Sequence, residues 1–176
     1  MGNFNPEVIP DMRTRLFFGI IYSDPESLDR AVNWIRENCG IAHETPVIPF
    51  DYTDYYKEEM GWPLWRLWIA TKRIILENEL VEWKLKSIEK EKELAVEGKR
   101  RVNLDPGGIS KPRVVLVTTK NYSHRIYMGK GIFAEITLLF KKGGYHPLPW
   151  TYPDYASEFF IKFASHVRRL KDDKIY

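Results

Sequence analysis

The chain has 176 residues and a formal net charge of +3, and 44% of its residues are hydrophobic and 14% aromatic. This composition is enough for one hydrophobic core, so we expect a single domain over residues 1–176. The charge is lower than that of most nucleic-acid-binding proteins, which makes nucleic acid an unfavoured partner. No apolar run approaches the roughly 20 residues that span a bilayer, so we expect no membrane segment.

Two further features of the composition concern the cellular setting. Cys39 is the only cysteine, which excludes an internal disulfide and a cysteine-based zinc site. A cytoplasmic location is therefore the default expectation. The chain also lacks glutamine and is rich in Lys and Glu, a pattern that favours a thermophilic source.

The first 50 residues predict a strand, a helix and a weaker strand. Residues 14–22 are apolar on both alternating faces and predict a buried strand. Residues 23–26 provide a helix cap and an acidic first turn, and Gly40 provides the stop of that helix. Residues 41–50 contain two prolines and predict an interrupted or edge strand.

The middle of the chain predicts one strand and one long helix. Residues 64–72 alternate as a strand, and apolar residues at helical spacing predict a helix over 78–97. The outer face of this helix, from Lys84 to Glu93, carries charges of both signs. We interpret it as a solvated surface.

The second half is rich in strands. Residues 101–105 predict a short strand that ends at Asp105-Pro106-Gly107, a sequence typical of a turn. Residues 114–119 are β-branched and apolar on both faces, as in a central strand. A hairpin is predicted from residues 125–128 and 132–140, with a three-residue loop at 129–131.

The chain ends with a turn and a helix. Residues 143–144 begin a turn that leaves room for one more strand, and apolar residues on one helical face predict a helix over 154–171. The order β-α-β-β-α-β, then a hairpin and a final helix, predicts an α+β fold with helices packed on a largely antiparallel sheet. A ferredoxin-like beginning is one reading of this order.

Polar side chains that could bind a ligand or take part in catalysis are concentrated between residues 101 and 135. Arg101, Asn103 and Asp105 alternate along one strand face. If Met128 pairs with Ile132 in the hairpin, Arg125 lies opposite Glu135. The two readings of that pair are an ordinary ion pair, or an arginine held so that it can grip a phosphate or carboxylate.

His124 falls on the apolar face of the same predicted hairpin, beside Lys120 and Arg125 in the sequence. A histidine on such a face is more often a hydrogen-bonded core residue, but these neighbours also suit proton transfer. Asp105 has a similar pair of readings, as part of a turn or as part of a ligand site.

A second unusual segment, residues 51–61, mixes carboxylates with tyrosines. Asp51 and Asp54 could hold a hard cation such as Mg²⁺ through oxygen ligands, although the spacing of a calcium loop is missing. Tyr52 and Tyr55 could instead anchor a loop through their rings. Trp150 lies in a similar aromatic segment that caps the last helix or forms a lid.

Known nucleotide and hydrolase signatures are missing. Residues 129–131 are not part of a phosphate-binding loop, and the glycine pattern of dinucleotide-binding folds and the serine elbow of hydrolases do not occur. The cofactor, if any, is therefore unknown.

Four segments carry a resemblance to a known family. Residues 50–61, 101–107, 118–127 and 150–155 resemble the prokaryotic family described as domain of unknown function 4416. The similarity spans almost the whole chain. It implies that these four segments define the family and are the places to expect a common site, and it implies no activity.

The polar residues predict a site for a small anionic ligand, built from residues 101–135, with catalysis left open. The alternatives are an RNA-binding module that uses basic and aromatic residues, or a non-catalytic protein that forms homo-oligomers. The candidate catalytic residues are His124, Asp105 and Glu135, the candidate ligand contacts are Arg101, Asn103, Lys120, Arg125, Tyr52, Tyr55 and Trp150, and the candidate metal ligands are Asp51 and Asp54.

Overall fold

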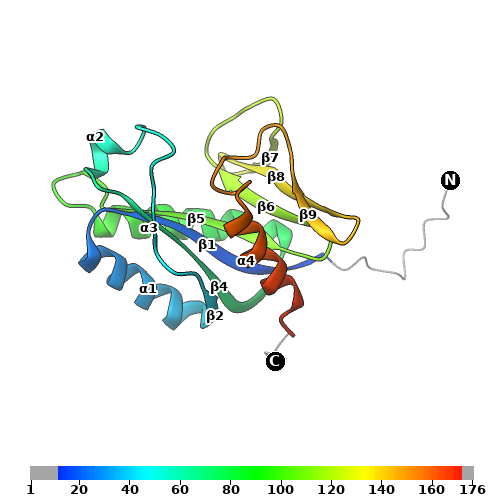
Figure 1. The fold of residues 1–176 in the computed structure, drawn as a ribbon. Helices are drawn as coiled ribbons and strands as arrows, with labels where there is room; N and C mark the ends of the chain where they lie inside the picture. Colours follow the sequence, from blue (N-terminus) through cyan, green and yellow to red (C-terminus); the bar gives the residue numbers. More distant parts are fainter. Residues whose placement is uncertain (1–11, 172–176) are drawn as a thin grey trace.

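A computed structural model describes residues 12–171 of the chain. They form one open, antiparallel sheet of nine strands with four α-helices, of which α1, α3 and α4 pack on the sheet (Figure 1). In chain order the elements are β1 (Arg13–Tyr22), α1 (Pro25–Cys39), β2 (Ile41–Glu44), β3 (Ile48–Pro49), α2 (Lys57–Met60), β4 (Trp65–Leu76), the short 3-10 helix η1 (Glu77–Glu79), α3 (Leu80–Leu94), β5 (Val102–Ile109), β6 (Arg113–Thr118), β7 (Ile126–Gly129), β8 (Ile132–Lys141), β9 (Gly144–Pro147) and α4 (Glu158–Arg169).

The strands lie in the order β2-β4-β1-β5-β6-β8-β7, with β3 beside β4 and β9 beside β8. The part β2-β4-β1-β5, crossed by α1 and α3, has the βαββαβ arrangement of a ferredoxin-like unit. The later strands extend this unit on the β5 side. The predicted α+β class, the antiparallel sheet and the ferredoxin-like beginning are therefore confirmed.

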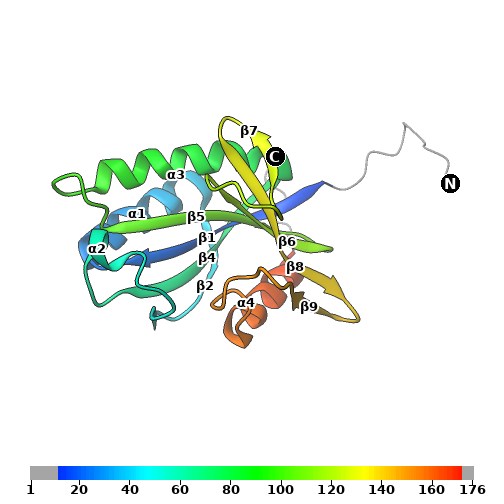
Figure 2. The ribbon, with the colours of Figure 1, turned by 90° about the horizontal axis from the view of Figure 1, so that it is seen from above.

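The two faces of the sheet are covered by different helices. Figure 2 shows α1 and α3 along one face and α4 on the other. Alternating residues of β1 divide between these layers, because successive side chains of a strand point to opposite faces. None of the helices in the described part of the chain has the length and apolar character needed to cross a membrane.

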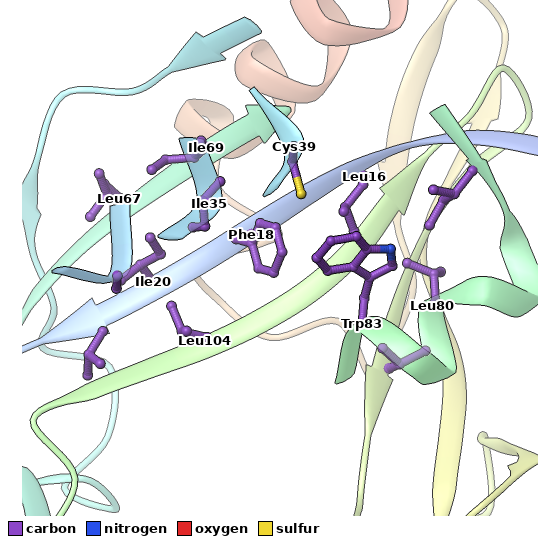
Figure 3. Packing of buried hydrophobic residues seen from close by; sticks show 14 of the residues in the cluster. Leu16, Phe18, Ile20, Ile35, Cys39, Leu67, Ile69, Leu80, Trp83 and Leu104 are labelled. Atoms are coloured by element: carbon purple, nitrogen blue, oxygen red, sulfur yellow. The ribbon is translucent and has the colours of Figure 1, made fainter. Parts of the chain in front are cut away.

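The larger core lies between β1, α1 and α3. Phe18 packs edge-on against Trp83 of α3, with ring centroids 6.1 Å apart, and Ile35 of α1 lies in the same cluster (Figure 3). The smaller core lies on the opposite face, where Phe17 of β1 meets Phe160 of α4 at 5.8 Å. Each core fixes one helix layer, and so the face on which α4 lies is set by the odd-numbered residues of β1.

The predicted turn at Asp105-Pro106-Gly107 is wrong, because these residues lie inside β5. The glycines there serve close packing. A Cβ on Gly107 would lie 2.6 Å from the Phe17 ring, and a Cβ on Gly108 would overlap the Thr14 side chain. Neither glycine needs the left-handed backbone of a turn.

The predicted solvated face of the long helix is wrong at two positions. The helix itself runs from Leu80 to Leu94, preceded by η1, and is shorter than predicted. Lys84 and Glu91 are buried on the side that faces β5. Both therefore belong to the interior of the molecule.

The predicted hairpin exists, with β7 and β8 as its strands, but its loop is shorter. Tyr127 pairs with Phe133 as predicted, whereas Ile132 pairs with Gly129 and not with Met128. The register shift between Tyr127 and Gly129 accounts for this difference. Arg125 precedes β7 and contacts Glu135 through side chains only.

The sheet opens between β5 and β6. These strands pair only at Gly107, Gly108 and Ile109, so residues 102–106 have no partner in β6. Instead, the amide of Leu104 donates to Glu91 Oε1 of α3 at 2.7 Å. This open stretch of β5 is where the sheet makes room for a cavity on the α4 face.

Candidate ligand cavity

The four sequence segments singled out above line one cavity of about 480 Å³. Its volume is within the range of small-molecule sites, about 300–1,000 Å³. Residues before α2, at the start of β5, after β6 and before α4 surround it. The lining residues are Ile21, Phe50, Tyr52, Thr53, Tyr55, Tyr56, Arg66, Lys84, Arg100, Asn103, Asp105, Leu116, Val117, Thr118, Thr119, Lys120, Tyr122, Arg125, Glu135, Tyr152, Pro153, Asp154 and Tyr155.

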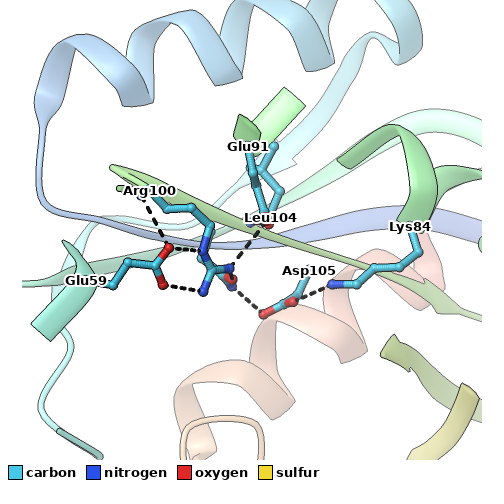
Figure 4. A network of polar contacts seen from close by, with 7 residues as sticks. Glu59, Lys84, Glu91, Arg100, Leu104 and Asp105 are labelled. Carbon is cyan, nitrogen blue, oxygen red and sulfur yellow. Dashed lines mark hydrogen bonds and ion pairs between the residues drawn. The ribbon is translucent and has the colours of Figure 1, made fainter. Parts of the chain in front are cut away.

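Asp105 lies on the floor of the cavity. Its Oδ1 accepts from Lys84 Nζ at 3.1 Å and its Oδ2 from Asn103 Nδ2 at 2.8 Å, and the side chain stays 28% exposed (Figure 4). Burial alone would raise the pKa of Asp105, but the charges of Lys84 and Arg66 outweigh it and lower the pKa. Asp105 is therefore an ionised hydrogen-bond acceptor at neutral pH.

Arg100 ties the floor to α2 and α3. Its Nε and Nη2 each donate to Glu59 at 2.8 Å, and its Nη1 donates to Asn103 Oδ1 at 2.8 Å (Figure 4). Nη1 also lies 3.4 Å from Glu91. The bidentate pair with Glu59 lowers the pKa of that carboxyl through its hydrogen bonds. Arg100 therefore holds the cavity wall and is already occupied.

Arg66 of β4 is the most deeply buried cation of the cavity. Its Nη2 lies 2.7 Å from Asp154 Oδ2, and its guanidinium lies over the rings of Trp68 and Tyr155 at 4.7 and 4.9 Å. Within residues 12–171, its Nε and Nη1 have no hydrogen-bond partner. Buried N–H groups without an acceptor are costly, so these two groups need an explanation.

Gly19 leaves room for the hydroxyl group of Tyr155. It lies between Asp105 and Trp68 in the sheet register, and a Cβ at this position would overlap the hydroxyl group of Tyr155. That hydroxyl is buried and also has no hydrogen-bond partner in the described part of the chain. Burial raises the pKa of Tyr155, so the hydroxyl stays a donor at neutral pH.

Lys120 lies at the exposed side of the cavity. Its ammonium sits 4.0 Å from the centroid of the Tyr55 ring. Among residues 12–171 it has no carboxylate within ion-pair distance, whereas the four other lining cations each have one. Tyr52 and Tyr55 are exposed and belong to the same rim.

Arg125 is brought to the cavity, but its nitrogens are all engaged. Nε donates to Glu135 at 3.1 Å, Nη1 to the carbonyl of Lys120 at 3.1 Å, and Nη2 to the hydroxyl of Tyr152 at 3.0 Å. The side chains of Arg125 and Glu135 are both 2% exposed. This arrangement suits a residue that fixes the backbone of Lys120 better than one that grips a ligand.

His124 does not lie among aliphatic side chains, as the hairpin register predicted. Its ring is stacked between Tyr122 and Trp150, with centroids 6.0 and 5.1 Å away. Its Nε2 lies 2.7 Å from Glu135 Oε1. His124 and Trp150 are not lining residues, so both reach the cavity only through neighbours.

Asp51 and Asp54 face a lysine. Lys57 Nζ lies 2.5 Å from Asp54 Oδ1 and 3.9 Å from Asp51 Oδ1. Both aspartates are exposed and neither lines the cavity. No group of three or more His, Cys, Asp or Glu side chains in residues 12–171 is placed to hold a metal ion.

Arg101 is the predicted anion contact that the fold places elsewhere. It precedes β5, its carbonyl accepts from the amide of Ser23, and its charge acts on Asp24 at the start of α1. The neighbouring Arg100 takes the place in the cavity wall. The predicted strand face therefore holds Asn103 and Asp105 without Arg101.

The sequence reasoning missed Arg66 and Lys84. Arg66 is a charged residue inside an apolar strand, which is itself a signal because a buried charge requires a partner. Lys84 follows Leu80 by four residues, and Leu94 follows Lys84 by ten, so the three lie toward the same side of α3. The sequence could therefore have predicted that Lys84 is buried. Their partners are distant in sequence and gave no local signal.

The comparisons with known proteins give one match. The model of a family described as domain of unknown function (DUF4416) matches residues 12–170. No curated protein matches the chain. No solved structure matches it either.

Proposed function

The chain belongs to the DUF4416 family, and from the geometry of its cavity we propose that it binds a small anionic ligand there. The proposal keeps Lys120 and Asn103 from the sequence prediction as residues of the site. Of the three predicted anion contacts, Arg101, Lys120 and Arg125, it keeps Lys120 and replaces the two arginines by Arg66.

One observation carries this proposal. Lys120 has no carboxylate partner among the described residues, and two N–H groups of Arg66 have no acceptor there, although both residues line the same cavity. The two Arg66 N–H groups are covered by neighbouring side chains, so an anion that accepts hydrogen bonds from Lys120 and from Arg66 must displace part of that cover. It would then offset the cost of the unpaired N–H groups. A phosphate or carboxylate group satisfies this requirement.

The remaining lining suits an organic body attached to the anion. Six tyrosines and Phe50 line the cavity, and ligand sites are typically aromatic and apolar with a few placed polar groups. Tyr52 and Tyr55 at the rim remain ligand contacts in this proposal, and Trp150 supports the rim by stacking on His124.

Proton transfer is a further part of the proposal, and it concerns His124, Glu135 and Asp105. His124 would exchange protons with the cavity through Glu135, because Glu135 lines it and His124 does not. Asp105 is ionised and faces the cavity, so it is able to accept a proton, but its lowered pKa makes it a weak base. Binding does not depend on either role.

Calorimetric titration with inorganic phosphate tests the proposed binding. We expect Lys120→Ala to weaken phosphate binding about tenfold, the effect of losing roughly one charge-assisted hydrogen bond. Lys162→Ala is the matched control, because Lys162 is an exposed lysine on α4 that pairs with Glu158 and does not line the cavity. Equal affinity in Lys120→Ala and wild type, or no phosphate binding by the wild type, would contradict the proposal.

Self-association is a second proposal, and the edge of the sheet favours it. The strand β7 is the last in the strand order, and its residues Ile126 and Tyr127 are 68% and 60% exposed. Exposed apolar edge strands are templates for pairing with another chain. These residues lie outside the cavity lining, so such pairing would leave the anion site free.

A further inference from the structure

The carboxylate of Asp105 faces the cavity with acceptor capacity to spare. A carboxylate has about four acceptor positions, and Lys84 and Asn103 use two of those on Asp105. The side chain is 28% exposed, and the surface that it exposes lies in the cavity. Only hydrogen-bond donors can match such a surface.

An anionic group by itself would not approach Asp105 favourably. The carboxylate of Asp105 repels an anionic group, and the ammonium of Lys84, 3.1 Å from its Oδ1, repels a cationic one. The part of the ligand that fits best near Asp105 is therefore neutral and carries donors. Hydroxyl groups meet both conditions. A carboxylate is also the group that accepts from ribose hydroxyls in dinucleotide-binding sites.

Asp105 and the anion contact Arg66 are separated by the width of a small organic molecule. Asp105 pairs with Gly19, Gly19 pairs with Trp68, and Arg66 lies two residues from Trp68 on the same face of the sheet. With strands about 4.8 Å apart and residues about 3.3 Å apart along a strand, the two Cα atoms are roughly 12 Å apart. Both side chains lie on the same face of the sheet as Gly19, and the hydroxyl group of Tyr155 lies above Gly19 between them.

Tyrosine rings bound the space between these two groups. Tyr56 and Tyr155 both act electrostatically on Arg66, and each feels the charge of Asp105, so both lie near the two polar ends. An aromatic ring packs on the C–H face of a sugar or on a planar base equally well. From Arg66 to Asp105, the lining therefore offers a contact for an anion, then aromatic rings for an organic group, and then an acceptor for hydroxyl groups.

Resting on the proposed anion site, we propose that the ligand is a phosphate ester with free hydroxyl groups, a sugar phosphate or a nucleoside phosphate. Its phosphate binds Lys120 and Arg66, and its hydroxyl groups donate to Asp105. The shared chemistry of the two ligand types is the hydroxylated phosphate ester.

Four probes separate the parts of this inference in calorimetric titrations. Inorganic phosphate and phenyl phosphate test the anion contact alone, whereas ribose phosphate and adenosine monophosphate add hydroxyl groups. For the wild type we expect the better of the two hydroxylated probes to bind about 10- to 100-fold tighter than phenyl phosphate, as one or two hydrogen bonds to a charged group predict. Which of the two binds better identifies the source of the hydroxyl groups.

The variant Asp105→Asn should reduce that preference to less than about threefold while phenyl phosphate binds as well as before or better. Asp54→Asn is the matched control, since Asp54 is exposed and outside the lining. Asp105→Asn leaves the buried ammonium of Lys84 without its carboxylate, so the double variant Lys84→Met/Asp105→Asn repeats the measurement if the single variant does not fold.

The outcomes distinguish the two proposals. If neither inorganic phosphate nor phenyl phosphate binds, the anion site itself is wrong. If both bind but the hydroxylated probes show no preference in the wild type, or keep their preference in Asp105→Asn and in the double variant, only the assignment of the hydroxylated ligand is overturned.

Discussion

Gly19 allows Tyr155, which lines the cavity, to pack against the sheet. Tyr155 places its hydroxyl where the side chain of any other residue at this position would begin, and the ring of Trp68 lies next to it. Glycine is needed here for space, because its backbone is in the extended conformation that every residue adopts. The same hydroxyl lies above the point where β1 passes between Arg66 and Asp105.

Gly19→Ala should therefore destabilise the fold by about 1–3 kcal/mol, the usual cost of overpacking a filled interior. Urea unfolding followed by circular dichroism measures this difference. Gly144→Ala is the matched control, because Gly144 is also a strand glycine and a Cβ there meets nothing closer than His146 at 4.0 Å.

The Tyr155→Phe background isolates the cause of this loss. Removing the hydroxyl removes the atom that the new Cβ would overlap, so Gly19→Ala should cost clearly less in that background. An equal cost in both backgrounds would show that the Tyr155 hydroxyl is not what excludes a side chain at position 19.

At the scale of elements, α3 replaces a strand as the neighbour of β5. Glu91 accepts from the amide of Leu104, where β6 would bond in a continuous sheet. Burial raises the pKa of Glu91, although the charge of Lys84 opposes this shift. A raised pKa means that the folded state favours the protonated carboxyl.

The sign of the pH dependence follows from that shift. The contribution of Glu91 to stability is complete below the pKa of the unfolded chain, near 4.5, and is lost as pH rises through the raised pKa of the folded state. The free energy of unfolding of the wild type minus that of Glu91→Gln should therefore decrease between about pH 4 and pH 8. Denaturant unfolding at several pH values measures it.

Glu89→Gln is the control for this helix, because Glu89 is exposed on the opposite side of α3. Its difference from the wild type should stay constant over the same range. A difference for Glu91→Gln that grows with pH would contradict the burial of a carboxyl group with a raised pKa.

The sequence predicted helices and strands well where neighbouring residues determine them. The alternation of β1 and the cap and stop of α1 are features of a few neighbouring residues, and both elements were predicted within one residue at most of their ends. The Asp105-Pro106-Gly107 segment was wrongly predicted as a turn. Gly107 and the following Gly108 are needed because they pack closely against Phe17 and Thr14 of β1. The spacing of residues along one strand cannot predict a contact with another strand.

The candidate site residues were also predictable only where the signal was local in the sequence. Lys120 and Asp105 were singled out because polar residues crowd their segments, and both line the cavity. Arg66 escaped notice because its partner Asp154 lies 88 positions further along the chain. Arg101 was preferred to Arg100 by strand alternation, which fails where the strand begins one residue later.

Across the whole molecule, the cavity lies where the sheet opens between β5 and β6, and the segments before α2, after β6 and before α4 surround the gap. Lys84 of α3 reaches Asp105 at the open stretch of β5, so one helix layer contributes to a site on the other face. We propose that Lys120 and Arg66, 54 positions apart, hold one anion in this space.

The most direct measurement is the side-chain Nε–H signal of Arg66 in nitrogen-15 NMR spectra during a titration with inorganic phosphate. We expect this signal to move downfield and to saturate at the affinity found by calorimetry, because an unpaired N–H group gains an acceptor. In Lys120→Ala the same shift should need a higher phosphate concentration. An Arg66 signal that stays in place while phosphate binds would show that Arg66 does not contact the anion.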